Sequence, residues 1–378
     1  MRFFWTAIFM ALASTLHAFE TSGTTAFVVD QTTGMVLYEK NVDAPLPPAS
    51  MSKLMTLNML FEALKDGRVN LDTEFRVSTK AHQMGGSKMF LADGSSVTVE
   101  NLIRGIIVQS GNDACIVVAE NLAGSEEIFA DVMTKRAQQL GMTQSRFANA
   151  TGWPHPEHRM SARDLVFLAD RLISEFPDYY TYFAEESFTW EGIAQDNRNP
   201  LLGLGLGADG LKTGHTSEAG YGLVGSAVQG NRRVIFVISG LESRAARAQE
   251  SQRIINWAFR QFVQKTLIKA GTELAEAKVW LGQNNQVGLV TGSDINALVP
   301  VLTIEPNKYE VTYNGPIPAP IAAGDELAKL VVTIDGLGEV RHPLYAAGDV
   351  AEGGLIKRMK ASATKLSAQY LGVELAGN

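Results

Sequence analysis

The sequence contains a single cysteine, Cys115, among its 378 residues. One thiol cannot form an intramolecular disulfide, so a disulfide framework and a four-cysteine zinc site are both excluded. Charged residues are also few, at 19%, and the 40 Asp and Glu outnumber the 33 Lys and Arg, which gives a net charge of -7. This balance argues against a surface built to bind a nucleic-acid backbone, so any cationic site must be local.

No apolar run is long enough to cross a bilayer as a helix, which takes about 20 residues. The first apolar stretch, from Phe3 to Leu12, follows Arg2 and leads into small and polar residues that end at Ala18. This order is typical of a cleaved secretory signal, and no cysteine follows it to carry a lipid. We therefore predict a signal peptide over residues 1–18 and export of the protein across the plasma membrane.

Apolar residues, in contrast, are plentiful at 46%, which is enough for one large or two ordinary folded domains. β-Branched runs around short turns predict hairpins early and late in the chain, and apolar residues at helical spacing fill the region between them. The expected strands are 25–29, 35–38, 221–227 and 234–239, and the expected helices begin at Pro47 and cover 101–108, 114–122, 126–140 and 245–263. This order predicts an α+β domain with a helical insert over residues 19–268.

The pattern changes after about Gly271, where Val, Ile and Thr runs alternate with Gly, Pro and Asn. These signals predict a small β-rich domain over residues 269–353. Residues 354–378 carry four basic residues and one acidic residue, and a helix would place the apolar side chains from Leu355 to Val373 on one face. We expect this tail to be an amphipathic, membrane-associating helix; a soluble helix packed on the β-rich domain is the alternative.

Three short motifs follow one another along the chain, and each alone carries little weight. They are Ser50-Met51-Ser52-Lys53, Ser110-Gly111-Asn112 and Lys212-Thr213-Gly214. The first two patterns should each arise about once by chance in a chain of this length, and Ser362 with Lys365 does repeat the first. Order and context give the three motifs their weight, because each falls on the kind of element that its chemistry requires.

The first motif suits nucleophilic catalysis. A serine hydroxyl is a weak nucleophile at neutral pH and needs a nearby base, and Lys53 lies three residues after Ser50, on the same face of the predicted helix. Lysine acts as a base only when its pKa is lowered, and burial and a second cation such as Lys212 both lower it. The alternative is a helix cap followed by a solvated lysine; it is less favoured because this helix start runs into apolar residues.

The other two motifs suit substrate binding. Ser110 and Asn112 lie between two helical runs, where a loop can direct a hydroxyl and an amide into a cleft; an ordinary turn is the alternative. Lys212 and Thr213 precede an apolar strand and can bind a carboxylate, while Gly214 would let a substrate backbone approach closely. A strand end with a solvated lysine is the alternative for this motif.

Longer stretches around these motifs resemble the D-alanyl-D-alanine carboxypeptidase family, which are low-molecular-mass penicillin-binding proteins of the serine β-lactamase and D,D-peptidase superfamily. The resemblance rests on Pro48 to Thr56, Ile103 to Ala114, Ser161 to Asp164, and Asp209 to Thr216 before Ala219-Gly220-Tyr221. It implies a catalytic domain with an antiparallel sheet flanked by helices, followed by a small all-β domain and an amphipathic C-terminal helix.

The resemblance also implies a role for each motif residue. Ser50 matches the acylated nucleophile, Lys53 its proton acceptor and Ser110 the relay toward the leaving amine. The implied substrate-binding residues are Asn112 at the substrate amide, Lys212, Thr213 and Gly214, the backbone N–H of His215 in an oxyanion hole with that of Ser50, and Arg247 at the substrate carboxylate. Arg244 is close enough in sequence to take the place of Arg247, and a charged helix face is the alternative for both.

The implied reaction removes the terminal D-Ala from peptidoglycan stem pentapeptides at the periplasmic face of the inner membrane. β-Lactam antibiotics are the implied covalent inhibitors and the membrane surface a further partner, with no metal, other cofactor or nucleic acid. A β-lactamase is less favoured because no Glu-x-x-Leu-Asn pattern lies between Asn112 and Lys212. A non-catalytic wall-binding or β-lactam-sensing protein would be expected to lack the nucleophile or its base, and endopeptidase activity on crosslinks stays open.

Three other features are not expected to carry chemistry. Cys115 begins an apolar helical run and fits a buried, inert thiol. His155, Glu157 and His158 occupy a proline-rich loop and lack the His-Glu-x-x-His spacing of a helical zinc site. The stretch from Gly203 to Gly207 lacks the lysine and the strand-turn-helix context of a phosphate-binding loop.

Overall fold

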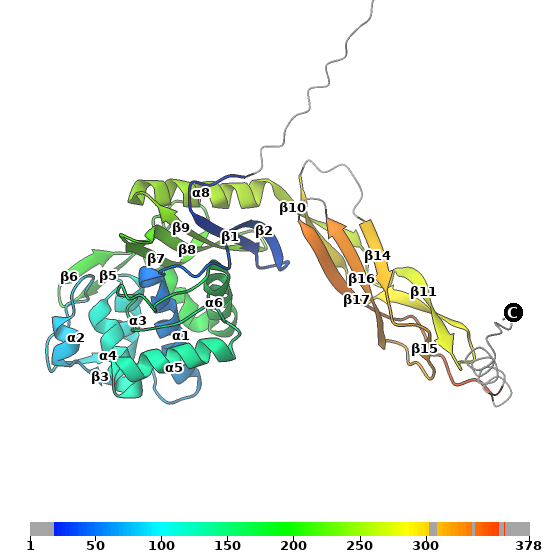
Figure 1. The fold of residues 1–378 in the computed structure, drawn as a ribbon, viewed down its shortest axis with the longest axis horizontal. Helices are drawn as coiled ribbons and strands as arrows, with labels where there is room; N and C mark the ends of the chain where they lie inside the picture. The colour runs from blue at the N-terminus through cyan, green and yellow to red at the C-terminus, as the bar shows by residue number, and fades with distance from the viewer. Residues whose placement is uncertain (1–18, 302–307, 335–336, 355–358, 360–378) are drawn as a thin grey trace, which may run out of the picture.

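A computed structural model describes residues 19–301, 308–334, 337–354 and 359. The chain forms two parts, a larger one with helices around a sheet and a smaller one made of strands (Figure 1). They join where α8 (Arg244–Arg260) is followed by β10 (Phe262–Ile268). The predicted signal peptide and nearly all of the predicted tail lie outside the described residues.

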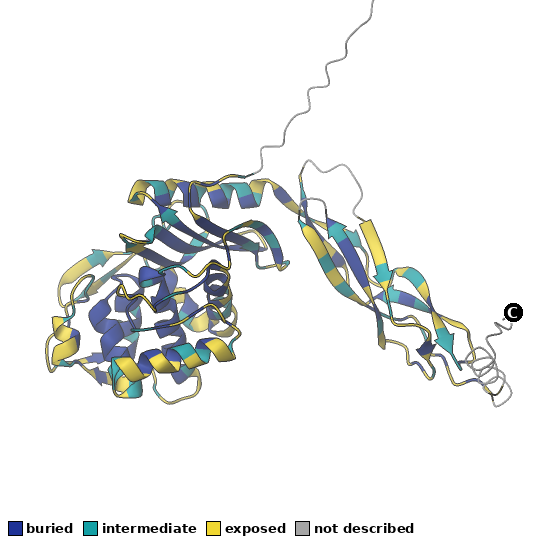
Figure 2. Cartoon of the chain, in the orientation of Figure 1, coloured by how far each residue is buried: buried dark blue, intermediate teal, exposed yellow. Residues whose placement is uncertain are grey.

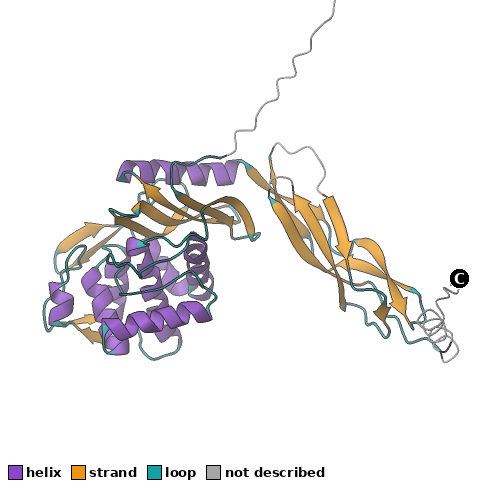
Figure 3. Ribbon diagram, viewed as in Figure 1, coloured by secondary structure: helices purple, strands orange, loops and turns teal. Residues whose placement is uncertain are grey.

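The larger part is built on a five-stranded antiparallel sheet in the order β2-β1-β9-β8-β7. Its strands are β1 (Thr25–Asp30), β2 (Met35–Lys40), β7 (Ala208–Thr216), β8 (Gly220–Gln229) and β9 (Arg232–Leu241). Helix α8 covers one face of this sheet, and a layer of helices covers the other (Figure 3). Both predicted hairpins, β1 with β2 and β8 with β9, are confirmed, and β7 forms one edge of the sheet.

The helical layer also contains two short strand pairs. Its elements are η1 (Ala49–Ser52), α1 (Lys53–Lys65), β3 (Glu74–Arg76), α2 (Thr79–Gln83), β4 (Ser96–Thr98), α3 (Val99–Ile107), α4 (Asn112–Ala123), α5 (Glu126–Gln139), α6 (Ala162–Glu175), α7 (Pro177–Tyr180), η2 (Thr181–Ala184), β5 (Ser187–Trp190) and β6 (Ile193–Asp196). Local chemistry sets several helix starts. Thr98, Ser125, Ser161 and Ser243 each accept a hydrogen bond from the backbone N–H three residues later, which caps α3, α5, α6 and α8.

The central sheet is buried on both faces, as the alternation along β9 shows. Ile235 and Val237 belong to the core beneath the helical layer, whereas Val234, Phe236 and Ile238 belong to the core that includes α8. Figure 2 shows buried residues running through the sheet and into the helices beside it. The sheet therefore gives β7 a rigid support.

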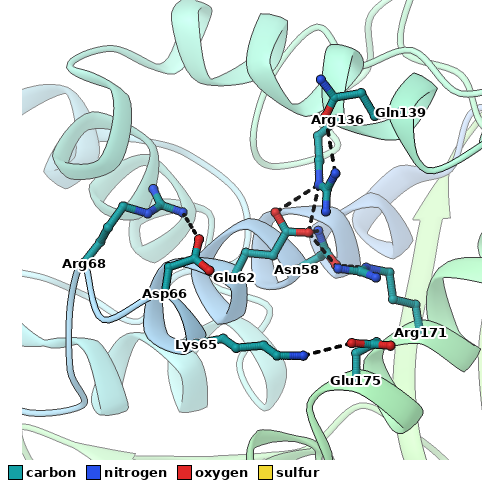
Figure 4. Close-up of polar contacts among 9 residues, drawn as sticks. All are labelled: Asn58, Glu62, Lys65, Asp66, Arg68, Arg136, Gln139, Arg171 and Glu175. Carbon is teal, nitrogen blue, oxygen red and sulfur yellow. Dashed lines mark hydrogen bonds and ion pairs between the residues drawn. The ribbon is translucent and has the colours of Figure 1, made fainter.

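Helix α1, which begins at Lys53, is fixed by charge as well as by apolar packing. Phe61 is fully buried, and Glu62 accepts from Arg136 of α5 and from Arg171 of α6, with nitrogen to oxygen distances of 2.9 Å for both pairs (Figure 4). Glu62 is only 14% exposed, so two guanidinium groups balance a carboxylate that is largely removed from water. This clamp ties α1 to two neighbouring helices and so fixes where Lys53 lies.

The smaller part is all β, as predicted. A six-stranded sheet has the order β14-β16-β17-β12-β11-β15, and β10 pairs with β13 in a second sheet. The strands are β11 (Glu273–Trp280), β12 (Gln286–Thr291), β13 (Ile295–Pro300), β14 (Lys308–Thr312), β15 (Ile317–Pro318), β16 (Glu326–Ile334) and β17 (Gly338–Ala346). Among the residues that the structure describes, β10 pairs with no strand other than β13 of this part, so we propose a domain boundary after Gln261 rather than after Ile268.

The prediction that the last helix of the larger part extends to Val263 is wrong. Helix α8 ends at Arg260, and Phe262 starts β10. The apolar pattern continues past the helix because the Phe262 ring packs edge-on against Trp257 of α8, with ring centroids 5.1 Å apart. A residue can thus satisfy a helical pattern while lying on a strand that reaches the same core.

Candidate active site

The turn that carries Ser50 has an unusual backbone. Ala49 has a φ of 50°, in the left-handed region, and Ser50 follows it in the 3-10 turn η1 before α1 begins. Gly152 packs directly against this turn, and a Cβ atom at that position would lie 1.9 Å from the Ala49 carbonyl oxygen. Ser50 itself is half-buried, so its hydroxyl is held by a tightly packed turn and is still accessible.

Lys53 contacts the nucleophile candidate directly. Its Nζ is 2.9 Å from Ser50 Oγ and 2.8 Å from Asn112 Oδ1, and it also donates to the Thr151 carbonyl oxygen. The Lys53 side chain is completely buried. The predicted pairing of Ser50 with Lys53 on one face of a helix start is therefore present in the structure.

The other two hydrogen-bond partners of Lys53 determine how its amine is oriented when the amine is neutral. The Asn112 amide oxygen and the Thr151 carbonyl oxygen can only accept hydrogen bonds, so they take the two hydrogens of a neutral amine. The remaining lone pair then faces Ser50 Oγ. Burial, with a smaller contribution from Arg198, lowers the Lys53 pKa to about 8, which makes the neutral form accessible near physiological pH.

Asn112, which contacts Lys53, is the first residue of α4, and Ser110 precedes it by two residues. Ser110 has a φ of 57° and is 1% exposed, and its Oγ has no hydrogen-bond partner within the described ranges. Asn112 donates through Nδ2 to the Gly85 carbonyl oxygen at 2.8 Å, so its amide orientation is fixed with Oδ1 toward Lys53. Within the described residues, the second Nδ2 hydrogen of Asn112 and the Ser110 hydroxyl have no protein partner, so they can serve a substrate.

Strand β7 brings the third motif against the nucleophile turn. Lys212 is 2% exposed and Thr213 6% exposed, and burial together with Lys53 and Arg198 holds the Lys212 pKa well below its usual range. We expected Gly214 to admit a substrate backbone. That expectation stays a prediction, and the structure adds a second reason for a glycine: a Cβ atom on Gly214 would lie 2.8 Å from the Pro48 carbonyl oxygen and 3.0 Å from Met51 Cγ, both in the segment that leads into and forms η1.

His215 and Tyr221 continue the site along the sheet toward α8. The exposed His215 ring stacks on Tyr221 with centroids 3.9 Å apart, and the Arg247 guanidinium lies 5.8 Å from the Tyr221 ring. Arg247 is 7% exposed, and burial and neighbouring arginines lower its pKa to about 10. Arg244, one turn earlier, is exposed. The two arginines between which the sequence left the choice open therefore differ in the structure, because Arg247 is buried and Arg244 is exposed.

Sequence reasoning missed two members of this site. Arg198 donates to Ser87 Oγ and lies close enough to both catalytic-motif lysines to lower their pKa values. It stands in the sequence between two asparagines, where no periodicity or motif marks it. The Thr151 carbonyl is the other, and a backbone acceptor leaves no signal in residue type.

Within the described residues, none of the side chains set aside earlier forms a hydrogen bond with a side chain of the three motifs. Cys115 is fully buried in α4, and burial raises its thiol pKa to about 12, as expected of an inert thiol. Glu157 forms an ion pair with Arg146. Over the described residues, no cluster of three or more histidine, cysteine, aspartate or glutamate side chains could hold a metal ion. Gly203 to Gly207 form turns before β7, with no helix following them.

Two family models together match most of the chain. The model for D-alanyl-D-alanine carboxypeptidases matches residues 12–243, and the model for the C-terminal domain of penicillin-binding protein 5 matches residues 262–352. The second match begins at the first residue of β10. Among curated proteins, the D-alanyl-D-alanine carboxypeptidase DacC of Escherichia coli is 36% identical over 340 residues, which is 88% of this chain and 85% of that protein.

Solved structures give the same picture. Penicillin-binding protein 5 from Haemophilus influenzae is 33% identical with a TM-score of 0.77, and the match covers 88% of this chain and 98% of that chain. Penicillin-binding protein D2 from Listeria monocytogenes, in its ampicillin-bound form, is 28% identical with a TM-score of 0.58 and covers 64% of this chain and 98% of that chain.

Proposed function

The chain belongs to the D-alanyl-D-alanine carboxypeptidase family and is a hydrolase of peptidoglycan metabolism, and from this premise we propose that it releases the terminal D-Ala of stem pentapeptides through an acyl-enzyme on Ser50. The observation that carries this proposal is the geometry of Lys53. Its Nζ lies 2.9 Å from Ser50 Oγ, and its other two partners can only accept hydrogen bonds.

In the acylation step, Ser50 Oγ attacks the carbonyl carbon of the penultimate D-Ala while its proton passes to neutral Lys53. The tetrahedral oxyanion accepts hydrogen bonds from the backbone N–H groups of Ser50 and His215. The close packing of Gly214 on the nucleophile turn supports this arrangement, because it sets the next residue of β7 beside Ser50.

Collapse of the tetrahedral intermediate breaks the peptide bond and releases D-Ala, whose amine takes up a proton. We assign the relay of that proton from Lys53 to Ser110, whose hydroxyl is buried and has no partner in the described part of the chain. Water then attacks the ester carbonyl, a proton returns to Ser50 Oγ, and the shortened stem peptide leaves as a carboxylate. Lys53 acts as the base in both halves of the reaction.

Recognition of the substrate carboxylate is assigned to a cluster of cations. Arg198 and Arg247 lie near Lys212, since both lower the Lys212 pKa, and Arg198 also lowers the Arg247 pKa. Thr213 follows Lys212 on β7 and adds a hydroxyl. Of the two candidate arginines on α8, we assign the role to Arg247, because it is buried against Tyr221 whereas Arg244 is exposed.

β-Lactam antibiotics bind to proteins of this family, and we propose that they acylate Ser50. The ampicillin-bound form of the Listeria monocytogenes relative supports this assignment. Slow release of the antibiotic is expected, because in the described part of the chain no carboxylate forms a hydrogen bond or ion pair with Ser50 or Lys53 to activate water for deacylation. This feature favours a carboxypeptidase over a β-lactamase.

We place the enzyme outside the plasma membrane, where peptidoglycan lies. The apolar stretch from Phe3 to Leu12 supports export, and the basic amphipathic pattern of residues 354–378 supports peripheral attachment to the membrane. No helix in the described ranges combines the length and apolarity needed to span a bilayer.

One experiment tests the reaction against its rivals. The purified protein is incubated with a stem pentapeptide, a crosslinked peptide dimer and a penicillin, and D-Ala release, crosslink cleavage and antibiotic turnover are quantified. We expect D-Ala release with little antibiotic turnover, and the crosslinked dimer measures any endopeptidase activity. Rapid antibiotic turnover without D-Ala release would identify a β-lactamase and overturn the proposal.

A further inference from the structure

The described chain begins with a short segment that crosses α8. Residues 19–24 precede β1, and Figure 1 shows the chain passing over α8 before it enters this strand. Phe19 is the first residue after the predicted signal peptide, and Thr21, only two residues later, is 6% exposed. We call residues 19–24 the N-terminal strap. A buried residue so close to a chain end indicates that the strap is held by specific contacts.

The central contact of the strap is with the carboxylate of Glu250 on α8. Thr21 Oγ1 donates to Glu250 Oε2 at 2.7 Å, and Arg253 Nη1 pairs with the other oxygen, Oε1. The Gly23 N–H donates to Thr21 Oγ1 at 3.2 Å, so the hydroxyl hydrogen is left for Glu250. The Glu250 side chain is only 10% exposed, and a carboxylate so far removed from water requires such donors.

Further contacts extend the strap along α8. Arg253 Nη2 donates to the Glu20 carbonyl oxygen at 3.0 Å, and the guanidinium lies 5.6 Å from the Phe19 ring. The Phe19 ring stacks on Trp257 with centroids 4.5 Å apart. Glu250, Arg253 and Trp257 are spaced three and four residues apart, so they share one face of the helix. The strap therefore holds α8 over about two turns.

The strap is also tied to the central sheet. Lys40 of β2 donates through Nζ to the Thr21 carbonyl oxygen at 3.0 Å. A Cβ atom on Gly23 would lie 2.8 Å from Ile238 Cγ1 and 3.0 Å from the Ser239 carbonyl oxygen, so the strap lies directly against β9. Because the strap contacts both the helix and the sheet, it restricts how far α8 can rotate about its own axis.

Arg247, on the same helix, has weak contacts of its own. It lies three residues before Glu250, and its Nε has no hydrogen-bond partner in the part of the chain that the structure describes. Nη2 reaches the Arg198 carbonyl oxygen only at 3.5 Å, which is longer than an ordinary N–H···O bond. The Tyr221 ring lies 5.8 Å from the guanidinium. The position of this side chain therefore depends on the orientation of its helix.

We propose that the N-terminal strap positions Arg247 for the terminal carboxylate of the substrate, by fixing the rotation of α8 through the contact of Thr21 with Glu250. This inference rests on the role given to Arg247 in the proposed function. Thr21 and Glu250 are positioning residues that act through Arg247. Their loss should weaken substrate binding and leave the attack by Ser50 intact, so KM should rise while kcat is kept.

The test begins with Thr21→Val, which keeps the shape of the side chain and removes its hydroxyl. D-Ala release from a stem pentapeptide is measured with the mature protein. We expect KM to rise about three- to tenfold and kcat to change less than about twofold. Thr21→Ser keeps the hydroxyl and should have a KM close to that of the unmodified protein. An unchanged KM in Thr21→Val overturns the inference.

The same substitution in an Arg247→Gln background separates positioning from general stabilisation. With the positioned group removed, Thr21→Val should change KM less than about twofold. Arg253→Gln, which removes the partner of Glu250 Oε1, should show the same pattern and does not depend on the folding of the Thr21 variant. A strap that only stabilises the fold would raise KM by the same factor in both backgrounds, which contradicts the inference.

A matched control on α8 is Arg260→Gln. Arg260 is exposed in the last turn of the helix, beyond the residues that the strap contacts. This variant should keep the KM of the unmodified protein, and a rise equal to that of Thr21→Val would show that any change on α8 has the same effect and would overturn the inference. Absence of D-Ala release by the unmodified protein contradicts the proposed function instead.

Discussion

Lys53 has to lose a proton before it can accept one from Ser50. Its pKa of about 8 results mainly from complete burial, and the clamp on α1 holds the amine where this burial is enforced. Lys53 also helps to lower the pKa of Lys212, so the two amines influence each other and titrate as a coupled pair. The same burial that costs stability thus provides a usable base.

The pH dependence of acylation follows from this. Below pH 8 the amine is protonated and cannot accept the Ser50 proton, so we expect the acylation rate to fall about tenfold per pH unit and to level off above pH 8. Stopped-flow acylation by a chromogenic β-lactam from pH 5 to pH 10 measures the profile. A rate that does not change across this range would show that no lysine serves as the base.

Replacing the base by arginine separates charge from basicity. Lys53→Arg should lose at least about 10³-fold in kcat, because arginine keeps its proton in this pH range. Lys212→Arg should retain more activity, since it preserves a positive charge for the substrate carboxylate. Near-native acylation by Lys53→Arg, measured by the same stopped-flow assay, would be incompatible with the role given to Lys53.

The two arginines of α8 should differ sharply. Arg247→Gln removes a buried cation from the carboxylate site, and we expect kcat/KM for a stem pentapeptide to fall roughly 10- to 100-fold, mainly through KM. Arg244→Gln, one turn earlier and exposed, is the matched control and should change kcat/KM less than about threefold. A larger loss of kcat/KM in Arg244→Gln than in Arg247→Gln would show that Arg244 binds the substrate carboxylate instead.

At the scale of single residues, the sequence predicted the contact between Ser50 and Lys53 but not all of the residues that surround it. Ser50, Lys53 and Lys212 are where their motifs place them, because residue type and short spacing are local properties. Arg198 and the choice between Arg244 and Arg247 depend on chain segments far apart in sequence. No local pattern encodes such proximity.

Strand β7 and the turn η1 form the element that brings the motifs together. Gly214 permits this contact, because a Cβ atom there would meet the Pro48 carbonyl oxygen at 2.8 Å. The hairpins β1–β2 and β8–β9 were predicted from the sequence, since a short turn involves only neighbouring residues. The end of α8 was not, because Phe262 packs on Trp257 from a strand rather than from a further helical turn.

Gly214→Ala tests the contact between β7 and η1. The added methyl group must displace backbone atoms, so we expect the unfolding free energy to fall by about 1 to 3 kcal/mol. We also expect the acylation rate to fall, because the displaced turn carries Ser50. Gly348→Ala is the control, since nothing lies within 4 Å of its Cβ position. Chemical denaturation measures the first effect and β-lactam acylation the second. An unchanged acylation rate in Gly214→Ala would contradict the claim that the contact between Gly214 and η1 positions Ser50.

On the scale of the whole molecule, the chain forms a helical layer, a central sheet and a separate β-rich part. The order of apolar and β-branched runs in the sequence predicted all three. The domain boundary after Gln261 is a proposal that rests on the long-range pairing of β10 with β13, which no local sequence pattern encodes. Residues 354–378 lie almost wholly outside the described residues, so membrane attachment rests on their charge and amphipathic pattern alone.

Deletion of residues 355–378 tests that attachment. Lys357, Arg358, Lys360 and Lys365 each contribute about 1 kcal/mol near an anionic surface, so binding should depend strongly on salt. The mature full-length protein should sediment with anionic liposomes at low salt and be released at high salt, whereas the truncated protein should stay in solution and keep its activity on soluble peptide. Equal sedimentation of the two proteins would contradict membrane attachment through the tail.

The central claim is that Ser50 carries the acyl group, and trapping the acyl-enzyme tests it most directly. The protein is incubated with a penicillin, its intact mass is measured, and the modified peptide is sequenced. We predict a mass increase of one penicillin located on Ser50, no increase for Ser50→Ala, and retained labelling for Ser52→Ala, whose hydroxyl contacts the Ala49 carbonyl oxygen instead. A label on any other residue, or labelling of Ser50→Ala, would contradict the assignment.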